Sequence, residues 1–191
     1  MKTNTEAPNM TVGRAALLGL MKLYLEPLLD DCVTLLEIHK LMYFMQEAGE
    51  PLRLNYIKGK YGPYAKNLHH VLERIEGHYI VGYGDGAEAP GKTIEYKSDA
   101  IQKAMQFLDS KPETKKRFNS IEKLIYGFET PYGMELLSSV HWVAMQENKE
   151  AREDADAAIE SVHDWSARKR DFFHKEHIRV AWKHLIDNGW L

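Results

Sequence analysis

Apolar side chains recur at helical spacing along most of the chain. Residues 13–29 are rich in leucine, and their apolar positions lie three and four residues apart, which predicts a helix with one buried face. Residues 34–48 carry a wider apolar stripe, which places their helix at the centre of the core. Thr34 and Glu37 form the sequence of a capping box, and Gly49 supplies a left-handed stop. This second helix is therefore the best defined element of the chain.

The remainder of the first half alternates between short strands and turns. Residues 53–57 alternate apolar and polar side chains and predict a strand. Residues 58–64 (KGKYGPY) contain two glycines and a proline, so they cannot form a helix. A short helix follows from Asn67, and the strands predicted at 78–83 and 93–96 flank a glycine-rich turn. The first half thus combines helices with a small antiparallel hairpin.

The second half is helical by its spacing. Apolar positions three and four apart predict helices at residues 98–108, 115–128, 130–143, 155–169 and 175–188. The expected fold class is α+β, mainly α: a helical domain with a small antiparallel sheet in its first half. We expect residues 11–191 to form one domain, preceded at residues 1–10 by a disordered leader or the cut end of a longer protein.

Composition excludes several classes of protein. A net charge of −3 is not that of a strongly basic nucleic-acid binder, although local patches remain open. The single cysteine, Cys32, cannot form an intrachain disulfide or a cysteine-built metal site, and it fits a reducing cytoplasm. The chain contains no apolar run of the roughly 18 residues that would span a bilayer. These features predict a cytoplasmic protein without a membrane partner.

The candidate catalytic and metal-binding residues lack a recognisable pattern. His69 and His70 are adjacent and point about 100° apart on a helix, so they do not easily share one ion. His174 and His177 have helical spacing but no second pair of ligands. Residues 82–86 (GYGDG) lie inside the hairpin and open no helix, so they are interpreted as a turn rather than a phosphate loop. We predict no metal, no cofactor and no enzymatic activity.

Charge is distributed in two contrasting segments. The basic segment, residues 53–74, contains five basic residues and one acid, with tyrosines between its lysines. The acidic segment, residues 146–156, contains five acids and two basic residues. Tyrosine and arginine are enriched where proteins contact partners. The predicted partner-binding residues are Lys58, Lys60, Tyr61, Tyr64, Asn67, His70, Arg74, Asp85, Glu147, Glu150, Glu153 and Asp154.

Four motifs in the first half resemble a known family. Lys40-Leu-Met-Tyr-Phe44, Gly49-Glu-Pro-Leu52, Tyr61-Gly-Pro-Tyr64 and a helix ending in Glu76-Gly77 resemble the SocA-like (Panacea) antitoxin domain. The close match covers residues 35–86 and is similar to the C-terminal half of the DarG antitoxins. The resemblance implies that the chain binds and neutralises a DarT-like toxin, which attaches ADP-ribose to thymidine in DNA. DarG-like proteins also carry an N-terminal macrodomain that removes this ADP-ribose, and no part of the chain resembles it.

Two mechanisms are open under this resemblance. The acidic segment could imitate DNA in the toxin's DNA-binding cleft, or the basic segment could supply the main contacts. A rival function is a DNA-binding autoregulator of a toxin–antitoxin operon, with weak or indirect DNA contact. The residues do not indicate the oligomeric state or the face that meets a partner.

Overall fold

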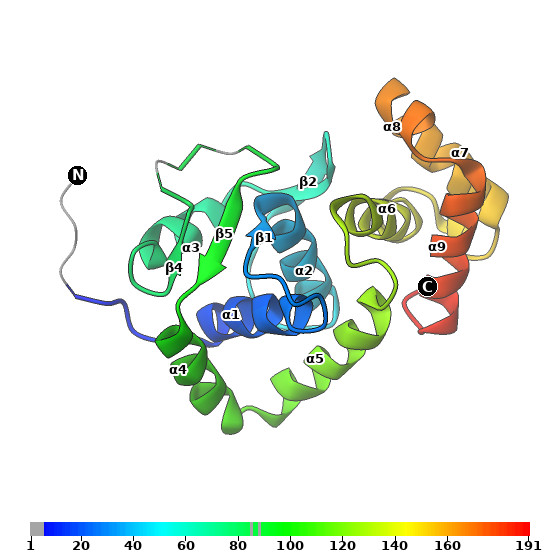
Figure 1. Ribbon diagram of the computed structural model, residues 1–191. Helices are drawn as coiled ribbons and strands as arrows, with labels where there is room; N and C mark the ends of the chain where they lie inside the picture. The colour runs from blue at the N-terminus through cyan, green and yellow to red at the C-terminus, as the bar shows by residue number, and fades with distance from the viewer. Residues whose placement is uncertain (1–5, 85, 88) are drawn as a thin grey trace. The chain divides into compact units, whose positions relative to one another are not determined.

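The computed structural model describes residues 6–84, 86–87 and 89–191 and confirms the predicted fold class, α+β and mainly α (Figure 1). Contacts divide the chain into two compact units. Unit 1 contains the residues up to 57 together with 64–122, and unit 2 contains residues 58–63 and 123–191. The expectation of one domain over residues 11–191 stays a prediction.

Unit 1 is built around two helices near the start of the chain. Helix α1 (Val12–Leu25) packs against α2 (Leu35–Glu47) and α4 (Ser98–Asp109). Helix α1 ends four residues earlier than predicted, because Pro27 has no N–H to continue the helical ladder and Leu29 has a positive φ of 53°. Helix α5 (Pro112–Ile125) begins three residues earlier than the predicted 115–128.

Helix α2 has the boundaries that its capping residues predict. The Thr34 hydroxyl accepts a hydrogen bond from the Glu37 amide, and the Thr34 amide donates to the Glu37 carboxylate at 2.8 Å. Gly49 adopts a φ of 97°, the left-handed conformation expected after a helix. All residues from 35 to 45 are buried, which confirms the central position of α2 in the core of unit 1.

A three-stranded antiparallel sheet lies in unit 1. Strand β5 (Thr93–Tyr96) pairs with β4 (Ile80–Val81), which confirms the predicted hairpin, and with β1 (Val33–Thr34) on its other side. Helix α3 (Leu68–Ile75) precedes β4. Strand β1 was not predicted, because two residues directly before a helix cap are too short to show a strand pattern.

A second hairpin consists of β2 (Tyr56–Gly59) and β3 (Gly62–Ala65). The strand predicted at 53–57 was placed too early. Arg53 has a positive φ of 58°, and the side-chain amide of Gln46 bonds both the amide and the carbonyl of Leu54 at 2.8 and 2.9 Å. This amide takes the place of a partner strand, so the ladder begins only at Tyr56.

Unit 2 is almost entirely helical. Helix α6 (Pro131–Trp142) packs against α9 (Lys175–Asp187), and α7 (Ala155–Trp165) packs against α9 and α8 (Ala167–Phe172). The acidic segment follows α6 as a π-helical turn (Val143–Glu147) and a 3-10 turn (Lys149–Arg152).

The helix predicted at residues 155–169 is broken in the structure. Ser166 is extended, and its hydroxyl accepts a hydrogen bond from the Lys169 amide at 3.1 Å, so it caps α8 as a separate helix. Across the described residues of both units, none of the helices combines the length and the apolar character needed to cross a membrane.

Candidate functional site

The tip of the β2–β3 hairpin, residues 58–63, packs on α7 and α8 within unit 2. The Lys58 ammonium lies 4.7 Å from the centre of the Trp165 ring, and the indole N–H of Trp165 donates to the Gly59 carbonyl at 3.1 Å. The Arg168 guanidinium lies 4.7 Å from the centre of the Tyr61 ring. These contacts give the lysines and tyrosines of the hairpin tip a packing role that the sequence did not reveal.

A buried carboxylate holds the first turn of α8 in place. Arg168 donates to the two oxygens of Glu135 at 2.6 and 3.1 Å, and Lys169 donates to Glu135 at 2.8 Å. The Lys169 ammonium also donates to the Ser139 hydroxyl at 2.9 Å. Glu135 and Lys169 are 2% and 0% exposed, whereas the Arg168 side chain is 32% exposed. Only Arg168 of these three ions therefore reaches solvent to a large extent.

The electrostatics of this cluster favour a structural role for Glu135. Burial by itself would raise the pKa of Glu135, but the hydrogen bonds and charges of Arg168 and Lys169 outweigh it, so the pKa lies below its ordinary value. Burial lowers the pKa of Lys169, and the Glu135 carboxylate opposes this shift. A buried carboxylate that is ionised at neutral pH cannot act as a general acid. The cluster instead anchors α8 and presents the Arg168 guanidinium at the surface.

The structure joins the two charged segments at one point. The Lys58 ammonium lies 2.8 Å from the Glu147 carboxylate, so Lys58, Lys60 and Tyr61 share unit 2 with the acidic segment. Glu147 also accepts a hydrogen bond from the Trp142 indole at 3.0 Å. The basic segment and the acidic segment, which the sequence left as alternative contact surfaces, are therefore joined by an ion pair.

The other predicted partner-binding residues have separate surroundings. In unit 1, Tyr64 stacks on His39 at 4.7 Å, and Asn67 bonds the backbone of Asn55 and Arg53. His70 and Arg74 are exposed on α3, and Asp85 lies outside the described residues. In unit 2, Glu150, Glu153 and Asp154 are exposed, and Asp154 caps α7 by accepting from the Asp156 amide at 2.9 Å.

One group of side chains on α3 has the proximity of metal ligands. Ligand atoms of His69, His70 and Glu73 lie within 4.8 Å of one another. Both ring nitrogens of His69 already have partners, because Nδ1 lies 2.6 Å from the Tyr83 hydroxyl and Nε2 lies 3.1 Å from Glu73. A metal would have to displace one of these contacts, so the group is a weak metal site.

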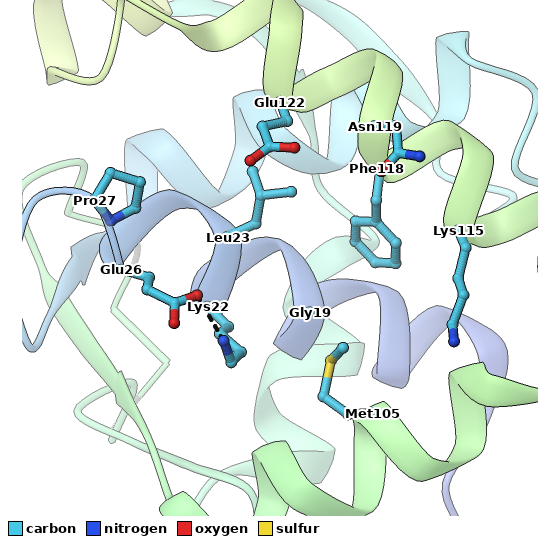
Figure 2. A pocket seen from close by; sticks show the side chains of 10 residues that line it. All are labelled: Gly19, Lys22, Leu23, Glu26, Pro27, Met105, Lys115, Phe118, Asn119 and Glu122. Carbon is cyan, nitrogen blue, oxygen red and sulfur yellow. Dashed lines mark hydrogen bonds and ion pairs between the residues drawn. The ribbon is translucent and has the colours of Figure 1, made fainter.

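A pocket of about 380 Å³ opens between α1, α4 and α5 in unit 1 (Figure 2). The Phe118 ring points into it over Gly19, and Leu23 and Met105 add to the apolar wall. The lysines at its rim are already paired, since Lys22 binds Glu26 and Lys115 binds Asp109, each at 2.6 Å. The exposed Glu122 adds a negative charge. This balance of charge does not suit a diphosphate ligand.

Several residues of the unit 2 site were not singled out from the sequence. They are Glu135, Trp165, Arg168, Lys169 and Phe172. The sequence did contain a signal for these residues, because three consecutive basic residues at 168–170 are followed by Asp171 and two phenylalanines, a combination of charge and aromatic side chains. The buried position of Lys169 could not be read from that run, since neighbouring charged residues are usually all solvated.

Comparison with known proteins gives relatives named for a hydrolase. No family model matches the chain. A protein of Thermus aquaticus is 41% identical over 184 residues, which is 96% of this chain and 49% of the relative. Proteins of Mycobacterium bovis and Mycobacterium tuberculosis are 37% identical over 193 residues, which is 95% of this chain and 54% of each relative. All three are named DNA ADP-ribosyl glycohydrolase, and the chain spans about half their length.

These names correct the interpretation drawn from the sequence motifs. The expected SocA-like antitoxin, its DarT-like toxin partner, its DNA mimicry and the absence of enzymatic activity are contradicted, because the relatives are named for removing ADP-ribose from DNA. The autoregulator alternative gains no support. The motifs are short, and Gly62 of the YGP motif has a φ of 93° inside the β2–β3 hairpin. Such a motif reports a backbone turn and does not by itself identify a function.

Proposed function

We propose that the chain takes part in the removal of ADP-ribose from DNA. The observation that carries this proposal is the 41% identity over 96% of the chain to a DNA ADP-ribosyl glycohydrolase of Thermus aquaticus. The chain spans about half of this relative. The name describes the whole relative, so hydrolytic activity of this chain is part of the proposal.

The reaction sets requirements that the described residues can be compared with. Water attacks the ribose carbon through which ADP-ribose is joined to the DNA base. The bond to the base breaks, the base takes up a proton and stays in the DNA, and free ADP-ribose is released. A glycosidase commonly uses an accessible carboxylic acid to protonate the leaving group. Glu135 does not meet this requirement, because it is buried, ionised and bonded to Arg168 and Lys169. The charges around Arg168 suit contact with an anionic substrate better than they suit bond cleavage.

An assay with ADP-ribosylated DNA tests the proposal directly. The chain is incubated with an oligonucleotide that carries ADP-ribose on one base, and released ADP-ribose and bound oligonucleotide are both quantified. The Thermus aquaticus relative serves as the positive control. We expect the chain to bind the modified oligonucleotide and to release ADP-ribose above the rate in buffer.

Release of ADP-ribose and binding of the oligonucleotide, measured separately, show whether this chain cleaves the bond or only binds the modified DNA. Release assigns the hydrolysis to this chain, and binding without release assigns the cleaving groups to the remaining half of a longer protein. A folded chain that neither binds the modified oligonucleotide nor releases ADP-ribose would contradict the proposal.

A further inference from the structure

Three side chains of helix α3 converge on one point, and we call His69, His70 and Glu73 the α3 cluster. One donor atom from each lies within 4.8 Å of the others. Adjacent residues on a helix point about 100° apart, but Glu73 lies four positions after His69 and three after His70. It therefore projects between them, about 40° from His69 and about 60° from His70 around the helix axis. Glu73 thus supplies the donor that lies between the two imidazoles.

The contact between His69 and Glu73 has nearly the spacing of two ligands on one ion. Nε2 of His69 lies 3.1 Å from the Glu73 carboxylate. Two donors that bind one zinc ion at about 2.0–2.2 Å in a tetrahedral site lie roughly 3.4 Å apart. An ion that replaces the proton between these two atoms therefore moves them only slightly. The imidazole of His70, whose ring centre lies 5.3 Å from that of His69, then has to turn to bring in the third donor.

The surroundings of His69 orient its ring as a metal-binding histidine requires. Its Nδ1 lies 2.6 Å from the hydroxyl of Tyr83, a fully buried residue. The amides of Gly82 and Tyr83 donate to the Glu76 carboxylate at 3.2 and 3.1 Å, so the backbone that carries this hydroxyl is held in place. A hydroxyl can accept as well as donate, so it can receive the Nδ1 proton when Nε2 binds an ion. Such a hydrogen bond at the second ring nitrogen is the usual support of a metal-binding histidine.

The α3 cluster is open to solvent on one side and covered on another. The side chains of His69 and Glu73 are 27% and 49% exposed, and His70 is exposed. The backbone at Gly86 covers the other side, because a Cβ there would lie 3.2 Å from the His69 ring and 3.3 Å from the Glu73 carboxylate. An ion can therefore enter from solvent, while the backbone at Gly86 limits how far the two donors can move apart.

We propose that the α3 cluster binds one zinc ion through Nε2 of His69, a ring nitrogen of His70 and the Glu73 carboxylate. Two imidazoles and a carboxylate are a known ligand set for zinc, whereas magnesium and calcium prefer oxygen ligands. Within the described part of the chain the cluster supplies three donors, so water takes the fourth position. The ion has to replace the contact between His69 and Glu73, so its binding is weak and reversible. The site does not depend on the proposed function, because it involves neither DNA nor ADP-ribose.

Titration calorimetry of the metal-free chain with zinc chloride, in a buffer that does not chelate zinc, tests the α3 cluster. We expect the tightest site to hold one ion per chain. Tyr83→Phe keeps all three ligands but removes the hydroxyl that supports His69, and should weaken binding about tenfold. His69→Ala and Glu73→Gln each remove a ligand and should weaken it further. Magnesium chloride should not compete with zinc.

A second pair of histidines provides the matched control. His174 and His177 are exposed near the start of α9, and their ring centres lie 5.4 Å apart. Among the described residues, no cysteine, carboxylate or further histidine completes a group of three with them. His174→Ala should therefore bind zinc as tightly as the parent chain. Glu160→Gln removes an exposed carboxylate from α7 and should also have no effect.

Two further measurements keep the test independent of folding. Thermal melts show whether each variant is folded, which the 49% exposure of the Glu73 side chain favours for Glu73→Gln. In the parent chain, nitrogen NMR of the imidazoles should show zinc bound at Nε2 of His69 and a proton on Nδ1. A zinc-induced shift at His174 and His177 with none at His69 would overturn the inference.

The calorimetry can overturn the inference in three ways. The parent chain fails to bind zinc, or folded His69→Ala and Glu73→Gln bind it as tightly as the parent, or His174→Ala weakens binding as much as His69→Ala does. In the last case the site lies on α9 and not on α3.

Discussion

Lys58 and Glu147 form an ion pair with 2.8 Å between the ammonium and the carboxylate, although 88 residues separate them in the chain. Lys58 belongs to the basic segment and Glu147 to the acidic segment. The Lys58 ammonium also lies over Trp165, and Glu147 also accepts from the Trp142 indole. Both charges are partly neutralised by contacts within unit 2, so neither segment is a uniform surface of one sign.

A double-mutant cycle should measure a small coupling between Lys58 and Glu147. Lys58→Met and Glu147→Gln keep most of the side-chain volume while removing the charges. Their side chains are 38% and 30% exposed, so we expect a coupling of about 0.2–1 kcal/mol, weakened by salt. Urea denaturation of the parent, the single variants and the double variant at low and high salt gives this value. A coupling that does not change with salt would contradict an ion pair as its source.

Neutralising Glu135 should destabilise unit 2 strongly. Glu135→Gln leaves the buried Lys169 ammonium without its carboxylate, and breaking a buried pair in this way costs about 3–5 kcal/mol. Chemical denaturation measures the loss. Glu160→Gln is the matched control, because Glu160 is exposed on α7 and the same substitution there should change stability by less than about 0.5 kcal/mol. Equal effects of both substitutions would show that the Glu135 cluster is not a stabilising anchor.

Two buried histidines should make the protein less stable as the pH falls. Burial lowers the pKa of His39 to about 3, with a further contribution from Lys40, and burial lowers the pKa of His141 to about 4. In the unfolded chain both titrate near pH 6.5, so below that pH the unfolded state binds more protons than the folded state. The free energy of unfolding should therefore fall between about pH 6.5 and 4, by roughly 1.4 kcal/mol per pH unit for each histidine.

A variant at position 39 tests that pH dependence. His39→Asn removes one of the two titrating groups, so unfolding free energies measured from pH 6.5 to 4.5 should show a shallower pH slope than the parent. The assignment fails if His39→Asn keeps the full slope of the parent chain.

Replacing Gly82 with alanine should lower the stability of the protein more than replacing Gly84 with alanine. A Cβ at Gly82 would lie 2.4 Å from the Thr93 carbonyl oxygen of strand β5, and the residue has a φ of 104°. Gly84 has a φ of 60°, and a Cβ there meets nothing within 4 Å. Gly84→Ala should cost about 1 kcal/mol from backbone strain alone, and Gly82→Ala clearly more. Thermal melts of the two variants compare them, and equal melting temperatures would contradict the close approach to β5.

The sequence predicted those elements whose signals lie within a few residues of one another. The capping box of Thr34 with Glu37, the stop at Gly49 and the cap at Thr130 all appear in the structure, because each depends on neighbouring residues and backbone geometry. The β4–β5 hairpin was likewise predicted from its strands and turn. Local spacing was not sufficient at Ser166, where a single cap divides one apolar pattern into two helices.

The candidate site depended on the tertiary structure. Glu135 meets Lys169 at a separation of 34 positions in the sequence, Tyr61 meets Arg168 at 107, and Lys58 meets Glu147 at 89. No periodicity within a helix or strand records such pairs, because they arise only when separate elements pack together. By itself the sequence determined the helices, the hairpin and the fold class. The tertiary structure decided which charges are buried, which are paired and which aromatic side chains remain exposed beside Arg168.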